Sequence, residues 1–524
     1  MTETTRRRTI EFALFAMWLV VVVYAAWNHV VWRDEVRAYS RALHGDNLFA
    51  MLQGIHGEGH PALWYLLVRG AHTLLPRPQV LQLVAFLVAS AAVLILLLRS
   101  PFSWPLKALL LAGNAFVFEY SVMARNYGVS ALLLFLLAMF YPRHRNRGPL
   151  LGILLFLLAN SNVHSLLLVG GFLLFWLVDI AIDDRALRRQ RLRTFSWNAA
   201  IAVLGGAVCI LTIFPPVSDS AVIERPSNVF PPLLEAVFLP GGTFKELMTV
   251  SLEPHLRAAD PDSLPFQLLL SALLFGSTLG LIRRPAIFLA ALVTLAGMSV
   301  LFKFVYPGSY RHEALWLSFL IGCYWIATVK PSPADPPIPS GLRRLLLPVS
   351  TLGWTLFVVL VAIQVPIGCA NVAGALRDGP PLSRSRDLGV LIRRRPDLRD
   401  AVLIAEPDYL LESLPYYMSN PTYLMREQRF GNVVTWTRKA RLQLSLGDVL
   451  ANARSLRSET NRPVLILMAH PLDPGERARV FREGYAWTFV AAPREARDFL
   501  AATQLIERFP KALVDESFDV YLLK

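Results

Sequence analysis

The chain has 524 residues, of which 54% are hydrophobic and only 17% are charged, and its mean hydropathy is +0.45. This composition excludes an ordinary soluble globular protein and is typical of a protein with many membrane spans. The net charge of +14 therefore indicates topology rather than nucleic-acid binding, because Lys and Arg gather on the cytoplasmic side of membrane proteins. The three cysteines have neither metal-ligand nor disulfide spacing.

Eleven apolar segments approach the length of about 20 residues that a membrane-spanning helix needs. If Arg6, Arg7 and Arg8 are cytoplasmic, every dense basic cluster that borders a span falls on the cytoplasmic face. The first segment is interpreted as a retained span, since it is long for a signal peptide and lacks a small-residue cleavage site. We therefore expect a multi-pass protein of the cytoplasmic membrane with a cytoplasmic N-terminus. The expected spans are residues 10–31, 79–98, 106–123, 126–141, 148–162, 163–182, 196–214, 264–282, 286–305, 312–329 and 345–367.

Residues 62–75 are shorter than a span and contain Arg69 and His72, so we expect a helix that lies along the outer interface. The alternative is a short true span that is paired with another one. Residues 369–524 carry frequent charges and alternate short β-type runs with helical stretches. The expected architecture is an α-helical polytopic membrane domain over residues 1–368 and a small extracytoplasmic α/β domain over residues 369–524. Its expected strands are residues 401–405, 464–469, 488–492 and 518–523, and its clearest helix is 445–457.

The polar stretch 32–61 follows the first span and is expected on the outer face of the membrane. It begins with the adjacent carboxylates Asp34 and Glu35, which we interpret as catalytic. A carboxylate at a water-poor interface has a raised tendency to accept a proton, which suits a general base. The structural alternative is that Asp34 caps the helix that follows it, where acidic residues are favoured in the first turn.

His56, Glu58 and His60 form an H-x-E-x-H pattern beside two glycines. On an extended segment the three side chains would share one side and could hold a metal, but the zinc-protease pattern H-E-x-x-H is absent. We favour substrate binding without a metal or other cofactor, and a divalent metal stays as the alternative. In this interpretation His60, just before Pro61, contacts a lipid-linked phosphate, although interfacial histidines without any such role are common.

Other polar residues stand at the outer ends of expected spans. Arg125, followed by Tyr127, can bind a phosphate or the loop carboxylates through its planar guanidinium, or can simply reach the lipid headgroups. A polar group opens the tenth span and is larger than anchoring requires. Asn160 and His164 are expected near the same surface, either in the same cavity or in helix-to-helix hydrogen bonds. The members of this group, at the outer start of the tenth span, are Tyr310, Arg311, His312 and Glu313, of which the first three are expected to bind substrate. The alternative is an interface belt with an internal Arg–Glu pair.

In this order, these motifs resemble the GT-C glycosyltransferases that use polyprenyl-phosphate-linked sugars, in particular the group with protein O-mannosyltransferases and the aminoarabinose transferase of lipid A. The resemblance covers residues 10–330. The motifs are Asp34-Glu35 after the first span, His60-Pro61 before a Leu- and Tyr-rich helix, the Ala-Arg-x-Tyr turn around Arg125, and Arg311-His312 in a late outer loop.

The resemblance implies a GT-C-like fold and a transferase that moves a hexose or pentose with inversion. The donor would be a polyprenyl-phosphate sugar and the acceptor a lipid, glycan or protein. By resemblance, Asp34 activates or orients the acceptor, His60 stands near the donor phosphate, and Arg125 and Arg311 hold the phosphate or the loop. Pro61 is not part of the proline pair found in many members, and the turn after Arg125 lacks the acidic residue that some members carry, so metal dependence is left open.

A transporter or flippase of lipid-linked saccharides is the alternative from another class. It predicts charged or broken helices near the bilayer midplane and repeated halves. Here the unusual charges stand at outer span ends and the halves show no symmetry, which favours the enzyme. A third alternative is an envelope scaffold, in which Asp34 would be dispensable.

Overall fold

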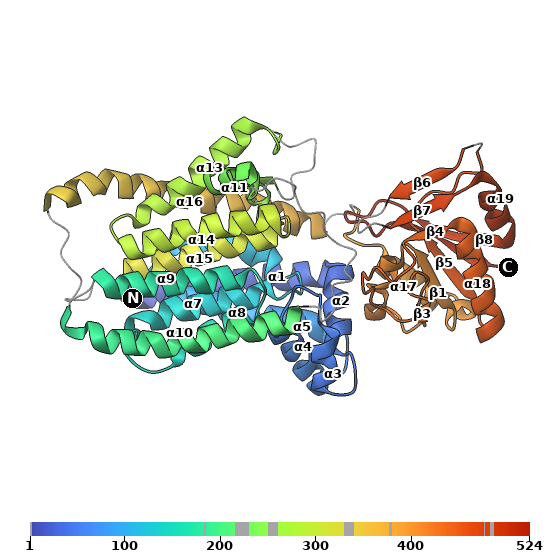
Figure 1. Cartoon of the computed structure of the whole chain (residues 1–524), viewed down its shortest axis with the longest axis horizontal. Helices are drawn as coiled ribbons and strands as arrows, with labels where there is room; N and C mark the ends of the chain where they lie inside the picture. The colour runs from blue at the N-terminus through green and yellow to red at the C-terminus, as the bar shows by residue number, and fades with distance from the viewer. Residues whose placement is uncertain are drawn as a thin grey trace.

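The computed structural model describes residues 3–182, 185–214, 230–249, 260–329, 340–376, 380–475, 477–482 and 487–524. A helical bundle is formed by the first part of the chain, and a separate α/β domain by the C-terminal part (Figure 1). The bundle helices are α1 Glu3–Asn28, α2 Arg33–Ala42, α3 Leu48–Gly54, α4 Ala62–Leu74, α5 Val80–Arg99, α6 Trp104–Ala112, α7 Tyr127–His144, α8 Leu150–Ala159, α9 Ser165–Ile182, α10 Arg185–Ile213, α11 Phe230–Phe238, α12 Glu246–Thr249, α13 Leu264–Thr278, α14 Pro285–Phe304, α15 Tyr310–Thr328 and α16 Ser340–Leu376.

The multi-pass character expected from the sequence is present. Within the described residues, seven helices are long and apolar enough to cross a membrane, namely α1, α5, α9, α10, α13, α14 and α16. The other expected spans coincide with helices that are shorter or more polar: α8 has 10 residues, and the segment 106–123 is interrupted after Ala112, before the short π-helix η1 Ala115–Glu119. The count of eleven spans therefore stays a prediction.

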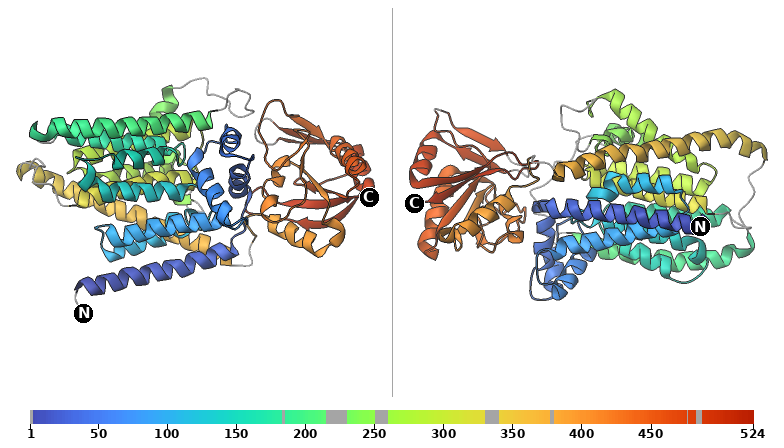
Figure 2. Two further views of the ribbon diagram at one scale, coloured as in Figure 1. Left: turned by 90° about the horizontal axis from the view of Figure 1, so that it is seen from below. Right: turned by 180° about the vertical axis from the view of Figure 1, so that it is seen from behind.

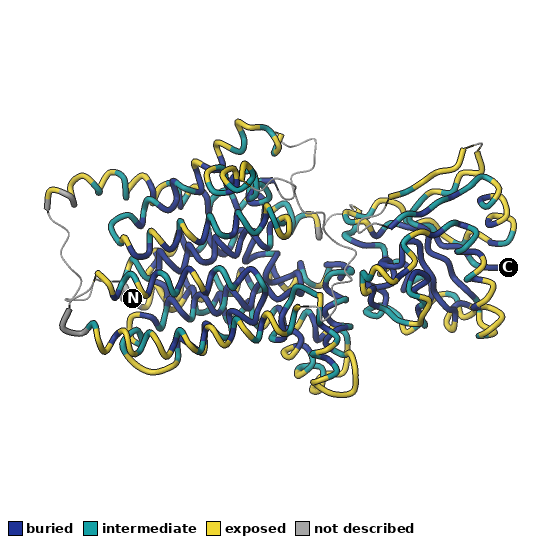
Figure 3. The backbone as a smooth tube through the Cα atoms, in the orientation of Figure 1, coloured by how far each residue is buried: buried dark blue, intermediate teal, exposed yellow. Residues whose placement is uncertain are grey.

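Helix α15 lies in the middle of the bundle, and its residues from His312 to Trp325 are all buried. Figure 3 shows this burial pattern, with dark central helices and exposed turns along the outer ones. The outer helices instead expose large apolar side chains, such as Trp27 and Leu211, as expected for surfaces that face lipid. The polar residues that open α15 are consequently enclosed by protein instead of forming a belt at a lipid interface.

The C-terminal domain is built on a four-stranded sheet in the order β1-β5-β9-β8. Strands β1 and β5 are parallel and the other neighbours are antiparallel. Both β1 and β5 are buried at every position, as is usual for parallel strands covered on both faces. A second sheet has the order β4-β7-β6, and β2 pairs with β3. The elements are α17 Ser385–Arg394, β1 Val402–Glu406, β2 Tyr423–Leu424, β3 Arg429–Phe430, β4 Gln443–Ser445, α18 Leu446–Thr460, β5 Val464–Met468, β6 Arg479–Arg482, β7 Thr488–Ala491, α19 Pro493–Ala502, β8 Thr503–Phe509 and β9 Phe518–Leu523.

Helices α2, α3 and α4 lie at the end of the bundle that is closest to the C-terminal domain (Figures 1 and 2). They come from the polar stretch that follows α1 and from the segment predicted as an interfacial helix. In the structure this segment is the 13-residue helix α4. Arg69 of α4 donates hydrogen bonds to the carbonyl oxygens of Ala42, His44 and Gly45, and so ties α4 to the end of α2.

Candidate active site

Asp34 lies in the first turn of α2, and two arginines from distant parts of the chain bind its carboxylate. Arg311 Nη2 donates to Asp34 Oδ2 at 3.0 Å, and Arg125 Nη1 lies 3.2 Å from the same oxygen. Arg125 Nη1 also donates to the main-chain carbonyl of Asp34 at 2.5 Å. The Asp34 side chain is 26% exposed, and its Oδ1 accepts no hydrogen bond from the described residues, although Arg33 Nε lies 4.0 Å from it. One carboxylate oxygen is thus fixed, and the other is available to a ligand.

Five helices begin around this carboxylate. Asp34 and Arg311 are in the first turns of α2 and α15, while His60, Arg125 and His164 stand just before α4, α7 and α9. The N-terminus of a helix carries a partial positive charge and free backbone N–H groups, so it attracts anions and disfavours cations. Arg125 and Arg311 face Asp34 there, with the buried Glu119 also near them, and together with the helix N-termini the two arginines leave the site with excess positive charge. The site is therefore suited to a second anion.

Three histidines continue the site away from Asp34. His60 Nε2 accepts a hydrogen bond from Arg125 Nη2 at 3.0 Å. His312 Nδ1 accepts from the Ser309 backbone N–H, which leaves Nε2 to donate to the Tyr127 hydroxyl at 2.8 Å. The ring of His164 lies 4.5 Å from that of His312, centroid to centroid.

Several polar atoms in this region are buried without any partner among the described residues, including Trp32 Nε1 beside Arg311. Both ring nitrogens of His164 are unpaired, and so is Arg311 Nε. A buried polar group without a hydrogen bond is costly. These atoms are therefore suited to bind the second anion that the positive charge of the site favours.

The charge state of the site follows from its contacts. Burial alone would raise the pKa of Asp34, but Arg125, Arg311 and Arg33 outweigh it and lower the pKa to about 2. The expectation of a raised proton affinity was wrong, because the sequence did not show that the arginines converge here. Burial, with the Arg125 charge beside it, lowers the pKa of His60 to about 3, and burial lowers that of His164 to about 4. At neutral pH Asp34 is thus ionised and both imidazoles are neutral.

Glu35, the second predicted catalytic carboxylate, is fully buried and points to the other side. Its Oε2 lies 2.8 Å from His29 Nε2 and accepts from the Trp32 backbone N–H at 3.2 Å. Its Oε1 accepts from the Ala124 N–H at 2.6 Å. The capping role proposed for Asp34 therefore belongs to Glu35. Its side chain accepts from the backbone N–H of Trp32, the N-cap residue of α2 three positions earlier. Through Ala124, the same carboxylate also fixes the turn that carries Arg125.

The H-x-E-x-H residues do not converge. Gly57 and Gly59 have left-handed φ angles of 81° and 69°, so the chain reverses at each of them. Glu58 faces α2, where Arg37 and Arg41 donate to it at 2.7–2.8 Å, while His60 faces Arg125. His56 is half-buried, and its Nδ1 has no partner among the described residues. Those residues include no group of three side chains arranged to hold a metal, and metal dependence stays a prediction.

The two remaining predicted residues, Tyr127 and Tyr310, lie in different surroundings. Tyr127 is buried between His60 and His312, next to the site. The hydroxyl of Tyr310 instead donates to Gln364 Oε1 of α16 at 2.7 Å, so Tyr310 packs behind the first turn of α15. Its predicted role in substrate binding has no contact with Asp34 or its arginines to support it.

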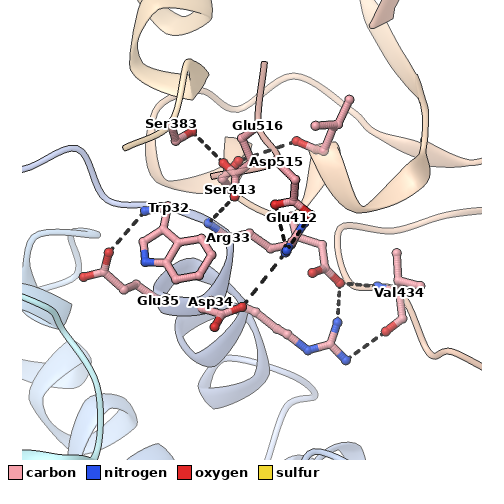
Figure 4. Close-up of polar contacts among 12 residues, drawn as sticks. Trp32, Arg33, Asp34, Glu35, Ser383, Glu412, Ser413, Val434, Asp515 and Glu516 are labelled. Atoms are coloured by element: carbon pink, nitrogen blue, oxygen red, sulfur yellow. Dashed lines mark hydrogen bonds and ion pairs between the residues drawn. The ribbon is translucent and has the colours of Figure 1, made fainter. Parts of the chain in front are cut away.

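The C-terminal domain holds the start of α2 through acidic side chains. The Arg33 N–H donates to Glu516 Oε1 at 2.8 Å, and the Arg33 guanidinium pairs with Asp515 at 3.0 Å. Arg37 pairs with Glu412 and donates to the Val434 carbonyl at 2.9 Å. Figure 4 shows Arg33 beside Asp515 and Glu516, and Glu412 beside Val434. Sequence reasoning missed these carboxylates, since no local pattern links residues that are more than 370 positions apart.

No known protein-family profile matches the chain, and no curated protein matches it in sequence. The solved structures that are similar to it include two of ArnT from Cupriavidus metallidurans. The crystal structure of ArnT in the apo state has 12% sequence identity and a TM-score of 0.49, over 98% of this chain and 97% of that chain. The crystal structure of ArnT bound to undecaprenyl phosphate has 12% identity and a TM-score of 0.47, over 98% of this chain and 97% of that chain.

Proposed function

We propose that this protein is a membrane glycosyltransferase that moves a sugar from a polyprenyl-phosphate donor to a lipid, glycan or protein acceptor at the outer face of the cytoplasmic membrane. The observation that carries the proposal is the Asp34 carboxylate held between Arg125 and Arg311, with Oδ1 accepting no hydrogen bond from the described residues and with unpaired donors beside it. This arrangement supplies a fixed anion for the acceptor and excess positive charge for a phosphate.

The donor phosphate would lie against the arginines and the histidines. A guanidinium has five N–H donors, and Arg311 uses Nη2 on Asp34 while its Nε is unpaired. The neutral His164 ring can donate one further hydrogen bond. These groups would stabilise the charge that grows on the phosphate as it leaves, which is where fixed donors lower a barrier most. The apolar helices around the site would accommodate the prenyl tail.

Asp34 would act on the acceptor. The acceptor oxygen or nitrogen forms a bond to the anomeric carbon while the bond from that carbon to the phosphate oxygen breaks, and polyprenyl phosphate leaves with the electron pair. Asp34 Oδ1 orients the acceptor hydroxyl or amine and takes its proton as the new bond forms. A carboxyl group with a pKa of about 2 releases that proton readily to solvent or to the phosphate, whose second pKa is about 6. A single displacement inverts the anomeric centre.

The test is a mass-spectrometric profile of envelope lipids and glycans, with cells that lack the protein compared with cells in which it is restored. The proposal predicts that one glycan or glycolipid lacks a sugar only in the deletion, and the missing mass identifies that sugar. If the deletion instead makes a lipid-linked saccharide accumulate on the inner leaflet, the protein is a transporter and the proposal fails, as it also does if the profile is unchanged.

A further inference from the structure

A cavity of about 360 Å³ lies between α2 and the C-terminal domain, outside the site around Asp34. This volume is within the range of pockets that bind small molecules, roughly 300–1,000 Å³. Ser40, Arg41 and His44 form one wall, and Arg429, Asn432 and Thr435 form the other. Both domains are therefore needed to build it.

The walls of the cavity offer hydrogen-bonding groups that the protein does not use. Arg41 is 9% exposed and donates from Nε to Glu58 at 2.7 Å, while its two terminal nitrogens donate to no described residue. Ser40 Oγ is buried without a partner. The side chains of Asn432 and Thr435 likewise form no hydrogen bond within the described part of the chain. Donors and acceptors are thus mixed around one small space.

The charges that border the cavity are already balanced. Glu58 neutralises Arg41, and Glu427 Oε2 accepts from Arg429 Nε at 2.8 Å and Nη2 at 2.6 Å. Each arginine that lines the cavity thus has a carboxylate partner, in contrast to the surroundings of Asp34. A phosphate would therefore gain little, whereas an uncharged group with many hydroxyls would satisfy the spare amide, hydroxyl and guanidinium groups. This chemistry is that of a saccharide.

The cavity and the candidate active site lie along the same face of α2. Residues seven positions apart in a helix face the same way, and Asp34 and Arg41 have this spacing. With a rise of 1.5 Å per residue, they are about 10 Å apart along the axis. Arg37, which lies between them, binds Glu412 and Val434 of the C-terminal domain. A molecule seated in the cavity would thus be close to Asp34 without replacing the donor.

We propose that this cavity is a saccharide subsite for the acceptor, so that the C-terminal domain takes part in acceptor recognition. The role of the saccharide as the acceptor rests on the proposed function, whereas the binding of a saccharide to the cavity does not depend on it. Binding energy gained at a distance from the reacting atoms would help to hold the acceptor nucleophile at Asp34.

The test is ligand-observed NMR on the full chain in nanodiscs, with glucose, mannose and arabinose as probes and inorganic phosphate as competitor. Two variants change the cavity in opposite ways: Arg429→Ala removes a wall, and Thr435→Trp fills the space. Arg494→Ala and Gln504→Trp are matched controls at exposed positions. We expect at least one sugar to bind, about tenfold weaker binding in both cavity variants, unchanged binding in both controls, and no displacement by phosphate.

Asp34→Asn separates the two proposals. If both hold, this variant binds the sugar normally but does not transfer, and Thr435→Trp raises the KM for the acceptor about tenfold with the donor KM unchanged. If no sugar binds, if Thr435→Trp binds it as the unchanged protein does, or if phosphate displaces it, the saccharide subsite is refuted. If sugar binding depends on Thr435 but deletion of the protein changes no envelope glycan, the subsite is real and the transferase proposal fails.

Discussion

Asp34 and Glu35 are chemically alike and adjacent in sequence, but successive residues of α2 project about 100° apart. Arg125 and Arg311 hold Asp34 by Oδ2, and its Oδ1 accepts no hydrogen bond from the described residues, whereas both oxygens of Glu35 are occupied inside the protein. A carboxylate with a free oxygen can act on a ligand. One that accepts backbone N–H groups from two segments positions those segments. We therefore assign chemistry to Asp34 and positioning to Glu35.

Replacing Glu35 by Gln tests this assignment through stability. Glutamine has the size of glutamate, but its amide cannot accept hydrogen bonds at both ends, so at least one of His29, Trp32 and Ala124 loses its acceptor. We expect a loss of about 1–3 kcal/mol in the free energy of unfolding, measured by thermal unfolding of the protein in nanodiscs. Asp34→Asn is the matched variant, and a smaller loss there is expected because Asp34 is partly exposed. Equal stability of Glu35→Gln and the unchanged protein would contradict the positioning role.

The pH profile of transfer tests the charge state of the site. The pKa values of Asp34, His60 and His164 are lowered to about 2, 3 and 4, so none of these groups changes its charge above about pH 5. We expect kcat/KM, which reports the free enzyme, to be level between about pH 5 and pH 8. If kcat/KM instead falls as the pH drops through about 6.5, and this fall is absent in His60→Gln, His60 titrates at its ordinary pKa and the expectation fails.

The same pKa of Asp34 has a consequence for stability. Its folded value of about 2 lies below the ordinary 3.8, so the ion pairs of Asp34 stabilise the fold above pH 3.8. That contribution is lost as the pH falls through about 2, because the folded state must then take up the proton.

At the scale of elements, α2 is the part of the chain whose position decides whether the site exists. Glu58 holds α2 from one side through Arg37 and Arg41, and the C-terminal domain holds it from the other through Arg33 and Arg37. The 10 residues of α2 are too few for a stable isolated helix. Its placement therefore depends on these ion pairs.

Glu58→Ala tests the dependence of α2 on its partners. Removing one member of a buried ion pair leaves the other charge uncompensated, which typically destabilises by about 3–5 kcal/mol, and the Glu58 side chain is only 5% exposed. We expect faster amide hydrogen exchange in α2 and a loss of transfer, with little change in α18. Glu459→Ala, at an exposed position of α18, is the control and should leave both the hydrogen exchange of α2 and the transfer unchanged. Equal protection of the α2 amides from exchange in Glu58→Ala and Glu459→Ala would contradict the dependence of α2 on Glu58.

Much of the secondary structure could be predicted from the sequence, because it follows from local periodicity. The strands β1, β5, β7 and β9 and the helix α18 lie within one to three residues of the expected segments. The break after Ala112 was missed because residues 106–123 are apolar enough on average to be taken as one span, although Gly113 and Asn114 stand at the break and Glu119 ends η1. The reversals at Gly57 and Gly59 were missed for another reason: an H-x-E-x-H pattern is compatible with an extended chain, and only the φ angles separate Glu58 from His60.

At the scale of the whole molecule, the candidate site joins segments that the sequence keeps far apart. The sequence indicated Asp34, His60, Arg125 and Arg311 individually, through their places at span ends. It could not show that Arg125 and Arg311 share one oxygen, or that Glu412, Asp515 and Glu516 anchor the start of α2. Such contacts depend on tertiary packing, which one sequence without relatives does not reveal.

The most direct test of the account is the envelope profile of cells that carry Asp34→Asn at the same membrane abundance as the unchanged protein. Asparagine keeps the size of the side chain but removes the charge that Arg125 and Arg311 hold. Asp473→Asn, at an exposed position of the C-terminal domain, is the matched control. The account predicts that Asp34→Asn lacks the same sugar as the deletion, while Asp473→Asn has the complete profile. A complete profile in Asp34→Asn would contradict the central claim that this carboxylate acts on the acceptor.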